Sequence, residues 1–115
     1  MSERTANDGF DEMFNYHRDL CLAARELMRR KNLDYGAQDN LWQNFTATEA
    51  LGLATTEVGI LIRMADKLSR LQSFAVRGEL AVKGESVQDA LIDIVNYTAL
   101  LGAYIERKSN GHHSG

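Results

Sequence analysis

The stretch ESVQDALIDIVNYTALLGAYIERK, Glu85 to Lys108, decides the fold of this chain because apolar residues recur along it at helical spacing. The serine in its second position is suited to cap the start of a helix. Ile92, Val95 and Ala99 widen the apolar surface beyond one stripe, so we expect this helix to be central. Its main stripe is predicted to consist of Val87, Ala90, Leu91, Ile94, Leu101 and Ile105.

The same periodicity predicts two further long helices, one from about residue 8 to Lys31 and one from near Thr55 to about Val76, with Gly78 just beyond the end. The predicted core face of the first consists of Phe10, Met13, Phe14, His17, Cys21, Ala24 and Met28. The predicted core face of the helix that starts near Thr55 consists of Val58, Leu61, Ile62, Ala65, Leu68 and Ala75.

A short helix is predicted between these two long ones. Thr46-Ala47-Thr48-Glu49 matches the capping box, in which a hydroxyl and a carboxylate satisfy reciprocal backbone donors, and Gly52 is suited to end the helix.

The chain therefore reads as one all-α domain. It has 115 residues, no proline, no convincing strand run and no repeat. We expect a single-domain helical bundle of three long helices plus one or two short ones, spanning residues 8–108 between a flexible N-terminus, 1–7, and a flexible tail, 109–115.

The amino-acid composition limits the kinds of partner that this chain is expected to bind. A net charge of −3 argues against a surface that grips extended nucleic acid, although a single nucleotide needs only a local cationic spot. No apolar run of about 18 residues and no export signal is present, so we expect a cytoplasmic protein without a membrane partner. Cys21, the single cysteine, is expected to be a buried thiol with no histidine beside it. Because so small a domain buries little surface, we also expect a homo-oligomer.

The acidic residues of the last helix need an explanation. Glu85, Asp89, Asp93 and Asn96 fall within about 80° of one another at roughly 100° per residue. Like charges four residues apart disfavour a helix, so a cation should compensate them.

Two sources of compensating positive charge remain open. One is an ion-pair network in which Arg63, Lys67 and Arg70 of the preceding helix neutralise the carboxylates. The other is Mg²⁺, a hard ion that commonly binds one or two carboxylates together with substrate phosphates. In that alternative Glu85, Asp89 and Asp93 hold the metal. Asp66 is then a further ligand or orients the attacking water, and the three cationic residues contact phosphate.

The segment from Asn32 to Phe45 has poor periodicity and is read either as a structured loop or as a binding loop. In the second interpretation Tyr35 and Trp42 stack on a base. Lys31, just before it, either meets phosphate or favours the end of the first helix. The polar candidates within the segment are Asp34 and Asn44.

Three motifs, taken in order, carry a resemblance: KNLDYG (31–36), RMADKLSRL (63–71) and ESVQDALIDIVNY (85–97). Together they resemble the phage and bacterial family called nucleotide modification associated domain, type one, over roughly residues 27–101. The resemblance implies a mostly helical protein of phage nucleotide metabolism, which would act in the host cytoplasm.

A more distant similarity is to the MazG and dimeric dUTPase type of all-α nucleoside triphosphate pyrophosphohydrolases, which implies Mg²⁺ held by acidic helices. The chain departs from that pattern. Thr55-Thr56-Glu57 stands where a double glutamate is sought, and Glu85 and Asp89 are four residues apart instead of three.

Three functions follow from these patterns. The first is a nucleotide-handling enzyme that splits a nucleoside triphosphate into monophosphate and pyrophosphate, with Asp66 and Glu85 as catalytic residues. The second is a binder that sequesters a nucleotide or a nucleotide-derived defence signal without turnover. The third is a helical oligomeric interaction module whose charged stripe is only an ion-pair network.

Overall fold

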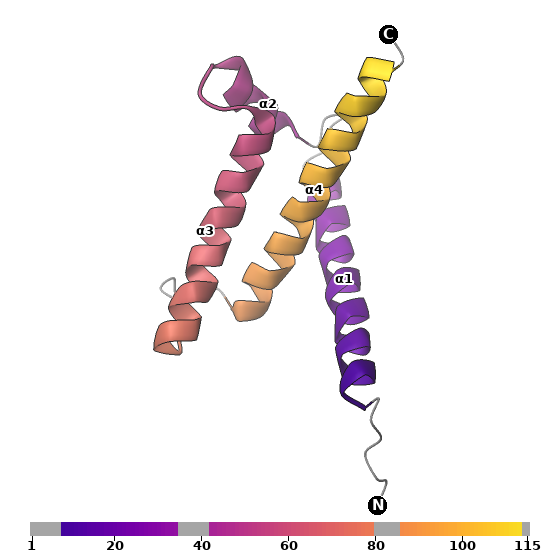
Figure 1. The fold of residues 1–115 in the computed structure, drawn as a ribbon, viewed down its shortest axis with the longest axis vertical. Coiled ribbons are helices and arrows are strands. Elements are labelled where there is room, and N and C mark those ends of the chain that lie inside the picture. Colours follow the sequence, from indigo (N-terminus) through magenta and orange to yellow (C-terminus); the bar gives the residue numbers. More distant parts are fainter. Residues whose placement is uncertain (1–7, 35–41, 80–85, 114–115) are drawn as a thin grey trace, which may run out of the picture.

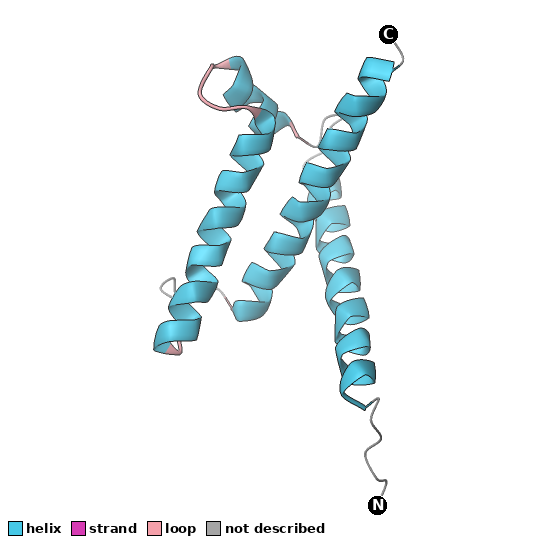
Figure 2. Cartoon of the chain, in the orientation of Figure 1, coloured by secondary structure: helices cyan, strands magenta, loops and turns pink. Residues whose placement is uncertain are grey.

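The computed structural model describes residues 8–34, 42–79 and 86–113, and all regular structure in these ranges is helical (Figure 2). This confirms the predicted all-α fold with three long helices and a short one. The four helices are α1 (Asp8–Asp34), α2 (Gln43–Ala50), α3 (Thr56–Arg77) and α4 (Val87–His113). None of them combines the length and apolarity needed to cross a membrane.

Helix α4 lies in the middle of the molecule, as expected from its wide apolar surface. It packs against α3 along most of its length and against α1 on the other side, whereas the described residues of α1 and α3 make no backbone contact with each other (Figure 1). Helix α3 runs antiparallel to α4, and α2 packs on the start of α3 (Figure 1). The three long helices therefore form an open arrangement and do not close around a common core.

The ends of α3 are where the sequence predicts them. The Thr55 side chain accepts a hydrogen bond from the Val58 N–H at 3.2 Å and caps the helix start. At the other end Gly78 takes a left-handed conformation, with φ of 79°, and its N–H donates to the Phe74 carbonyl. These two local signals fix the length of α3.

The predicted capping box at Thr46 is wrong. Helix α2 begins earlier, at Gln43, because the Trp42 carbonyl already accepts hydrogen bonds from the N–H groups of Phe45 and Thr46. Glu49 instead accepts a 2.9 Å hydrogen bond from the hydroxyl of Thr56, which is completely buried. This bond ties α2 to α3.

Helices α1 and α4 both extend beyond their predicted ends. Helix α1 continues past Lys31 to Asp34, and α4 continues past Lys108 to His113, so residues 109–113 are helical and not an irregular tail. The chain has no proline, and the polar residues that follow Lys108 do not interrupt the ladder of backbone hydrogen bonds.

The core is small. Among the described residues the buried hydrophobic side chains are Ala24, Trp42, Ile60 and Ala90. The predicted stripe of α4 is buried or half-buried except at Ile105, which is 50% exposed.

The predicted core face of α3 is wrong for the single chain, because every one of its six residues is exposed. Helix α4 packs instead on the side of α3 that carries Ile60, Met64 and Lys67, which are buried or half-buried.

The predicted face of α1 is only half correct. Cys21, Ala24 and Met28 are buried or half-buried, whereas the four earlier positions, Phe10 to His17, are exposed. The first turns of α1 extend beyond the start of α4 (Figure 1). Tyr16, which donates a 3.0 Å hydrogen bond to Gln88 in the first turn of α4, marks where the two helices meet.

Candidate functional site

Charged side chains meet between α3 and α4, as both interpretations of the acidic stripe require. The ammonium group of Lys67 lies 3.0 Å from a carboxylate oxygen of Asp93. Both side chains are largely shielded, at 15% and 21% exposure, so this pair is partly desolvated. Ion pairs of this kind depend on both partners, because either charge alone is costly to bury.

Asp89, one turn earlier on α4, is engaged in capping the helix. Its carboxylate accepts a 3.1 Å hydrogen bond from the Ser86 N–H, and the Ser86 hydroxyl accepts a 3.0 Å bond from the Asp89 N–H. The expected serine cap is thus present as a reciprocal capping box. These bonds, together with the nearby charge of Lys67, lower the pKa of the Asp89 carboxyl.

Lys67 therefore supplies positive charge to both Asp89 and Asp93. The like charges along α4 are compensated by this ammonium group and by the helix start, in agreement with the ion-pair interpretation.

The described carboxylates that were predicted to bind Mg²⁺ are engaged with protein partners. Asp66, Asp89 and Asp93 each have a protein partner, and no three described His, Cys, Asp or Glu side chains gather around a common point. Glu85, the fourth predicted ligand, lies outside the described residues.

A second charged feature occupies another side of α3. Asp66 forms a 3.0 Å ion pair with Arg70, four residues later on the same helix. Beside this pair is a hollow of about 540 Å³, which we call the α3 hollow. It is lined by Asp66, Ser69, Arg70, Gln72, Ser73, Val76 and Arg77.

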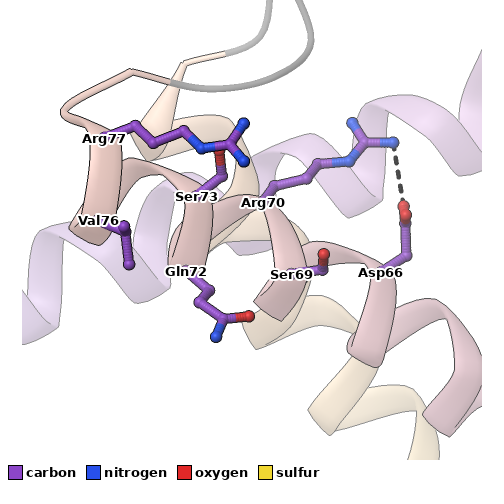
Figure 3. Close-up of a pocket in the computed structure, with 7 residues that line it drawn as sticks. All are labelled: Asp66, Ser69, Arg70, Gln72, Ser73, Val76 and Arg77. Carbon is purple, nitrogen blue, oxygen red and sulfur yellow. Dashed lines mark ion pairs between the residues drawn. The ribbon is translucent and has the colours of Figure 1, made fainter.

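The α3 hollow contains two guanidinium groups and two hydroxyls. Arg70 and Arg77 are separated by two helical turns, and their side chains extend in the same direction with Ser73 between them (Figure 3). Asp66 reaches Arg70 at one end (Figure 3). Apart from Asp66, the charged groups that line the hollow are cationic, so it is suited to an anion with several oxygen acceptors.

The structure brings some predicted site residues together and places others elsewhere. Lys67 and Arg70 lie on neighbouring sides of α3, Asn96 is half-buried on α4, and Arg63 and Lys31 are exposed. Tyr35 lies outside the described residues, as do the side chains of Asp34 and Asn44.

Trp42 is packed into the protein. The residue is 9% exposed, its indole N–H donates a 2.9 Å hydrogen bond to the Leu100 carbonyl, and its ring and that of Tyr104 are arranged edge to face. The Arg107 guanidinium lies 5.3 Å from its ring centre. The tryptophan thus joins the start of α2 to α4, and its ring is not presented to a base.

Sequence reasoning missed Ser69, Ser73 and Arg77, which line the hollow with Arg70. The signal was present, because Arg63, Asp66, Arg70, Ser73 and Arg77 are spaced by three and four residues. The polar stripe of α3 therefore continues past Arg70 to the end of the helix.

Sequence reasoning also missed a contact of the single cysteine. The sulfur of Cys21 lies 4.0 Å from Nδ1 of His17, one turn earlier on α1, so the expectation that no histidine stands beside it is wrong. The four-residue spacing of the two could have indicated this.

Comparisons with protein-family models, curated proteins and solved structures found no match to this chain.

Proposed function

We propose that this protein binds a nucleotide through its phosphate groups in the α3 hollow. The observation that carries the proposal is the pair of guanidinium groups, Arg70 and Arg77, aligned along one side of a hollow with Ser69 and Ser73. Guanidinium groups bind phosphate oxygens in a bidentate manner, and such charge-assisted hydrogen bonds are stronger than neutral ones.

The size of the hollow supports a small-molecule ligand. A volume of about 540 Å³ lies within the usual range of ligand sites, roughly 300–1,000 Å³. The choice of a nucleotide among phosphorylated ligands rests on the resemblance of three motifs to the nucleotide modification associated domain. On the same ground we place the protein in the cytoplasm, or in the host cytoplasm if a phage encodes it.

Binding without turnover is the version that the geometry favours. Hydrolysis through Mg²⁺ would require Asp89 to leave the Ser86 cap and Asp93 to leave Lys67, and both partnerships stabilise the fold. A sequestering binder needs only cationic groups and hydroxyls. The hydrolase that splits a triphosphate into monophosphate and pyrophosphate remains the second candidate, because Asp89 and Asp93 lie one turn apart on α4.

One experiment separates these functions. The protein is incubated with nucleoside mono- and triphosphates and cyclic nucleotides, with Mg²⁺ or with EDTA, and ligand binding is measured by calorimetry while products are followed by chromatography. We expect binding that survives EDTA and a ligand that is recovered unchanged. Pyrophosphate release that depends on Mg²⁺ would favour the hydrolase, and no binding of any ligand would contradict the proposal.

Substitution locates the site. Arg77→Gln removes one guanidinium from the hollow and should weaken nucleotide binding about tenfold or more, since a hydrogen bond to a charged group contributes roughly 1.5–3 kcal/mol. Arg25→Gln removes an exposed arginine from α1 and is the matched control. Equal affinities for the two variants would exclude the α3 hollow as the site.

A further inference from the structure

The α3 hollow contains a carboxylate, that of Asp66, among groups that are suited to bind an anion. Asp66 forms a 3.0 Å ion pair with Arg70 at one end of the hollow (Figure 3). A carboxylate and a phosphate present the same kind of oxygen acceptor to a guanidinium group. A phosphate that binds at this end of the hollow therefore competes with Asp66 for the hydrogen-bond donors of Arg70.

The other end of the hollow is different. Arg77 lies seven residues after Arg70, which is about 10.5 Å along the helix axis. Among the described residues, no carboxylate forms an ion pair with Arg77. The two guanidinium groups lie at different places along the hollow, with Ser73 between them (Figure 3).

This separation distinguishes two kinds of phosphate ligand. A single phosphate group is too small to contact both guanidinium groups, so it can bind at Arg77 while Asp66 keeps Arg70. A chain of phosphates that is bound at Arg77 extends past Ser73 toward Arg70 and meets the carboxylate there. Because the negative charges of Asp66 and of the ligand repel each other at short distance, only the chain is affected strongly by Asp66.

The exposure of the two side chains indicates which of them moves. The Asp66 side chain is 55% exposed, whereas that of Arg70 is 25% exposed. The carboxylate can therefore turn into solvent while the guanidinium group keeps its place in the hollow. An ion pair with so exposed a partner is weak, and several charge-assisted hydrogen bonds to phosphate are stronger than it is.

On the basis of the function proposed above, we propose that Asp66 is an internal competitor of the ligand. It pairs with Arg70 while the α3 hollow is empty, and a ligand with two or more linked phosphate groups displaces it. Asp66 thus lowers the affinity of the hollow for a phosphate chain and has little effect on a single phosphate. In this role Asp66 acts through Arg70 and does not touch the ligand.

The opposite role would be to hold Arg70 in the orientation that the ligand needs. The two roles predict opposite signs for Asp66→Asn, which removes the charge and keeps the size of the side chain. Loss of a competitor raises the affinity for a phosphate chain, whereas loss of an orienting partner lowers it.

Titration calorimetry with tripolyphosphate and with inorganic phosphate, in EDTA at constant ionic strength, tests the competitor. Asp66→Asn should raise the affinity for tripolyphosphate about two- to fivefold, the range expected for an exposed ion pair, and should leave that for inorganic phosphate nearly unchanged. Asp19→Asn is the matched control, because it removes the same charge from a 67% exposed side chain on α1. Unchanged or weaker binding of tripolyphosphate by Asp66→Asn, or an equal gain in Asp19→Asn, would overturn the inference.

A double variant shows whether Asp66 acts through Arg70. In an Arg70→Gln background the further change Asp66→Asn should bring no gain in affinity for tripolyphosphate, because residues that act as a pair are not additive. Asp66→Glu, which keeps the charge, should retain the affinity of the wild type. A full gain in the Arg70→Gln background would mean that Asp66 repels the ligand directly, and it would refute the internal competitor.

The role of Asp66 and the proposed function fail in different ways. If neither tripolyphosphate nor any nucleotide binds to the wild type, the proposed function is wrong and the competitor with it. If the wild type binds tripolyphosphate and Arg77→Gln weakens that binding, but Asp66→Asn does not strengthen it, only the role of Asp66 is wrong.

Discussion

At the scale of single residues, Lys67 has the largest influence on the charged surface between α3 and α4. Asp93→Asn leaves this shielded ammonium group without its 3.0 Å partner, so we expect the free energy of unfolding to fall by about 1–2 kcal/mol. Replacing both partners, as in Lys67→Met with Asp93→Leu, should recover part of the loss because the two charges of the shielded pair are removed together, although Asp89 then loses the nearby charge of Lys67. Urea denaturation of the single and double variants measures both effects.

The control for this prediction is a pair in a more exposed setting. Asp66→Asn acts on the ion pair with Arg70, in which the Asp66 side chain is 55% exposed, and should change stability by less than about 0.5 kcal/mol. If Asp93→Asn were as mild as Asp66→Asn, the buried pair would contribute nothing and the acidic stripe would need another explanation.

The sequence predicted that a cation compensates the acidic residues of α4, but it did not show which one. Carboxylates four residues apart indicate positive charge nearby whether that charge is an ammonium group or a metal ion. The choice depends on the rotation of α3, which brings Lys67 toward Asp93 and turns Arg70 toward Asp66 on its own helix. Helical spacing alone cannot specify how two helices are rotated against each other.

At the scale of helices, two glycines should respond oppositely to the same substitution. An added Cβ at Gly78 or at Gly102 meets nothing within 4 Å, so packing does not distinguish them. Gly78→Ala should cost about 1–2 kcal/mol because the left-handed conformation at the end of α3 disfavours a side chain. Gly102→Ala should stabilise by about 0.5–1 kcal/mol because Gly102 lies inside α4.

Thermal unfolding of both variants by circular dichroism checks this pair. A loss of stability in both would indicate that Gly102 lies against a neighbour that is absent from the single chain. A neutral Gly78→Ala would mean that α3 can end without its left-handed residue.

Helix ends were predictable where one residue decides them. Thr55, Gly78 and Ser86 each act through their own backbone or hydroxyl geometry, and the structure places all three as expected. Thr46 was misread because an earlier carbonyl, that of Trp42, starts α2 through tertiary anchoring of the tryptophan on α4. A capping motif states a local preference, which such an anchor overrides.

At the scale of the whole molecule, periodicity predicted an apolar face of α3 but not the side on which α4 packs. An amphipathic pattern reports that apolar residues share a side, and it is the same whether the covering helix belongs to the same chain or to another. The spacing of Val58, Leu61, Ile62, Ala65 and Leu68 predicts that they face the core, and the structure leaves them exposed. Apolar spacing therefore does not specify which side of α3 the neighbouring helix uses.

The open arrangement also predicts very unequal local stability. Helix α4 is the only described helix packed on two other long helices, whereas the first turns of α1 carry Phe10, Met13 and Phe14 at over 60% exposure. Amide hydrogen exchange should therefore be slowest in the middle of α4 and fastest, among the long helices, in residues 8–19.

Mass spectrometry of exchanged peptides measures this gradient, and α3 serves as its internal reference. Peptides from α3, which packs on α4 and α2, should exchange more slowly than residues 8–19 and faster than the middle of α4. Protection of residues 8–19 to the level of α4 would contradict that gradient. It would mean that the stacked Phe10 and Phe14 rings, 5.8 Å apart, are covered in solution. Such cover would have to come from outside the described residues, because these leave the start of α1 exposed.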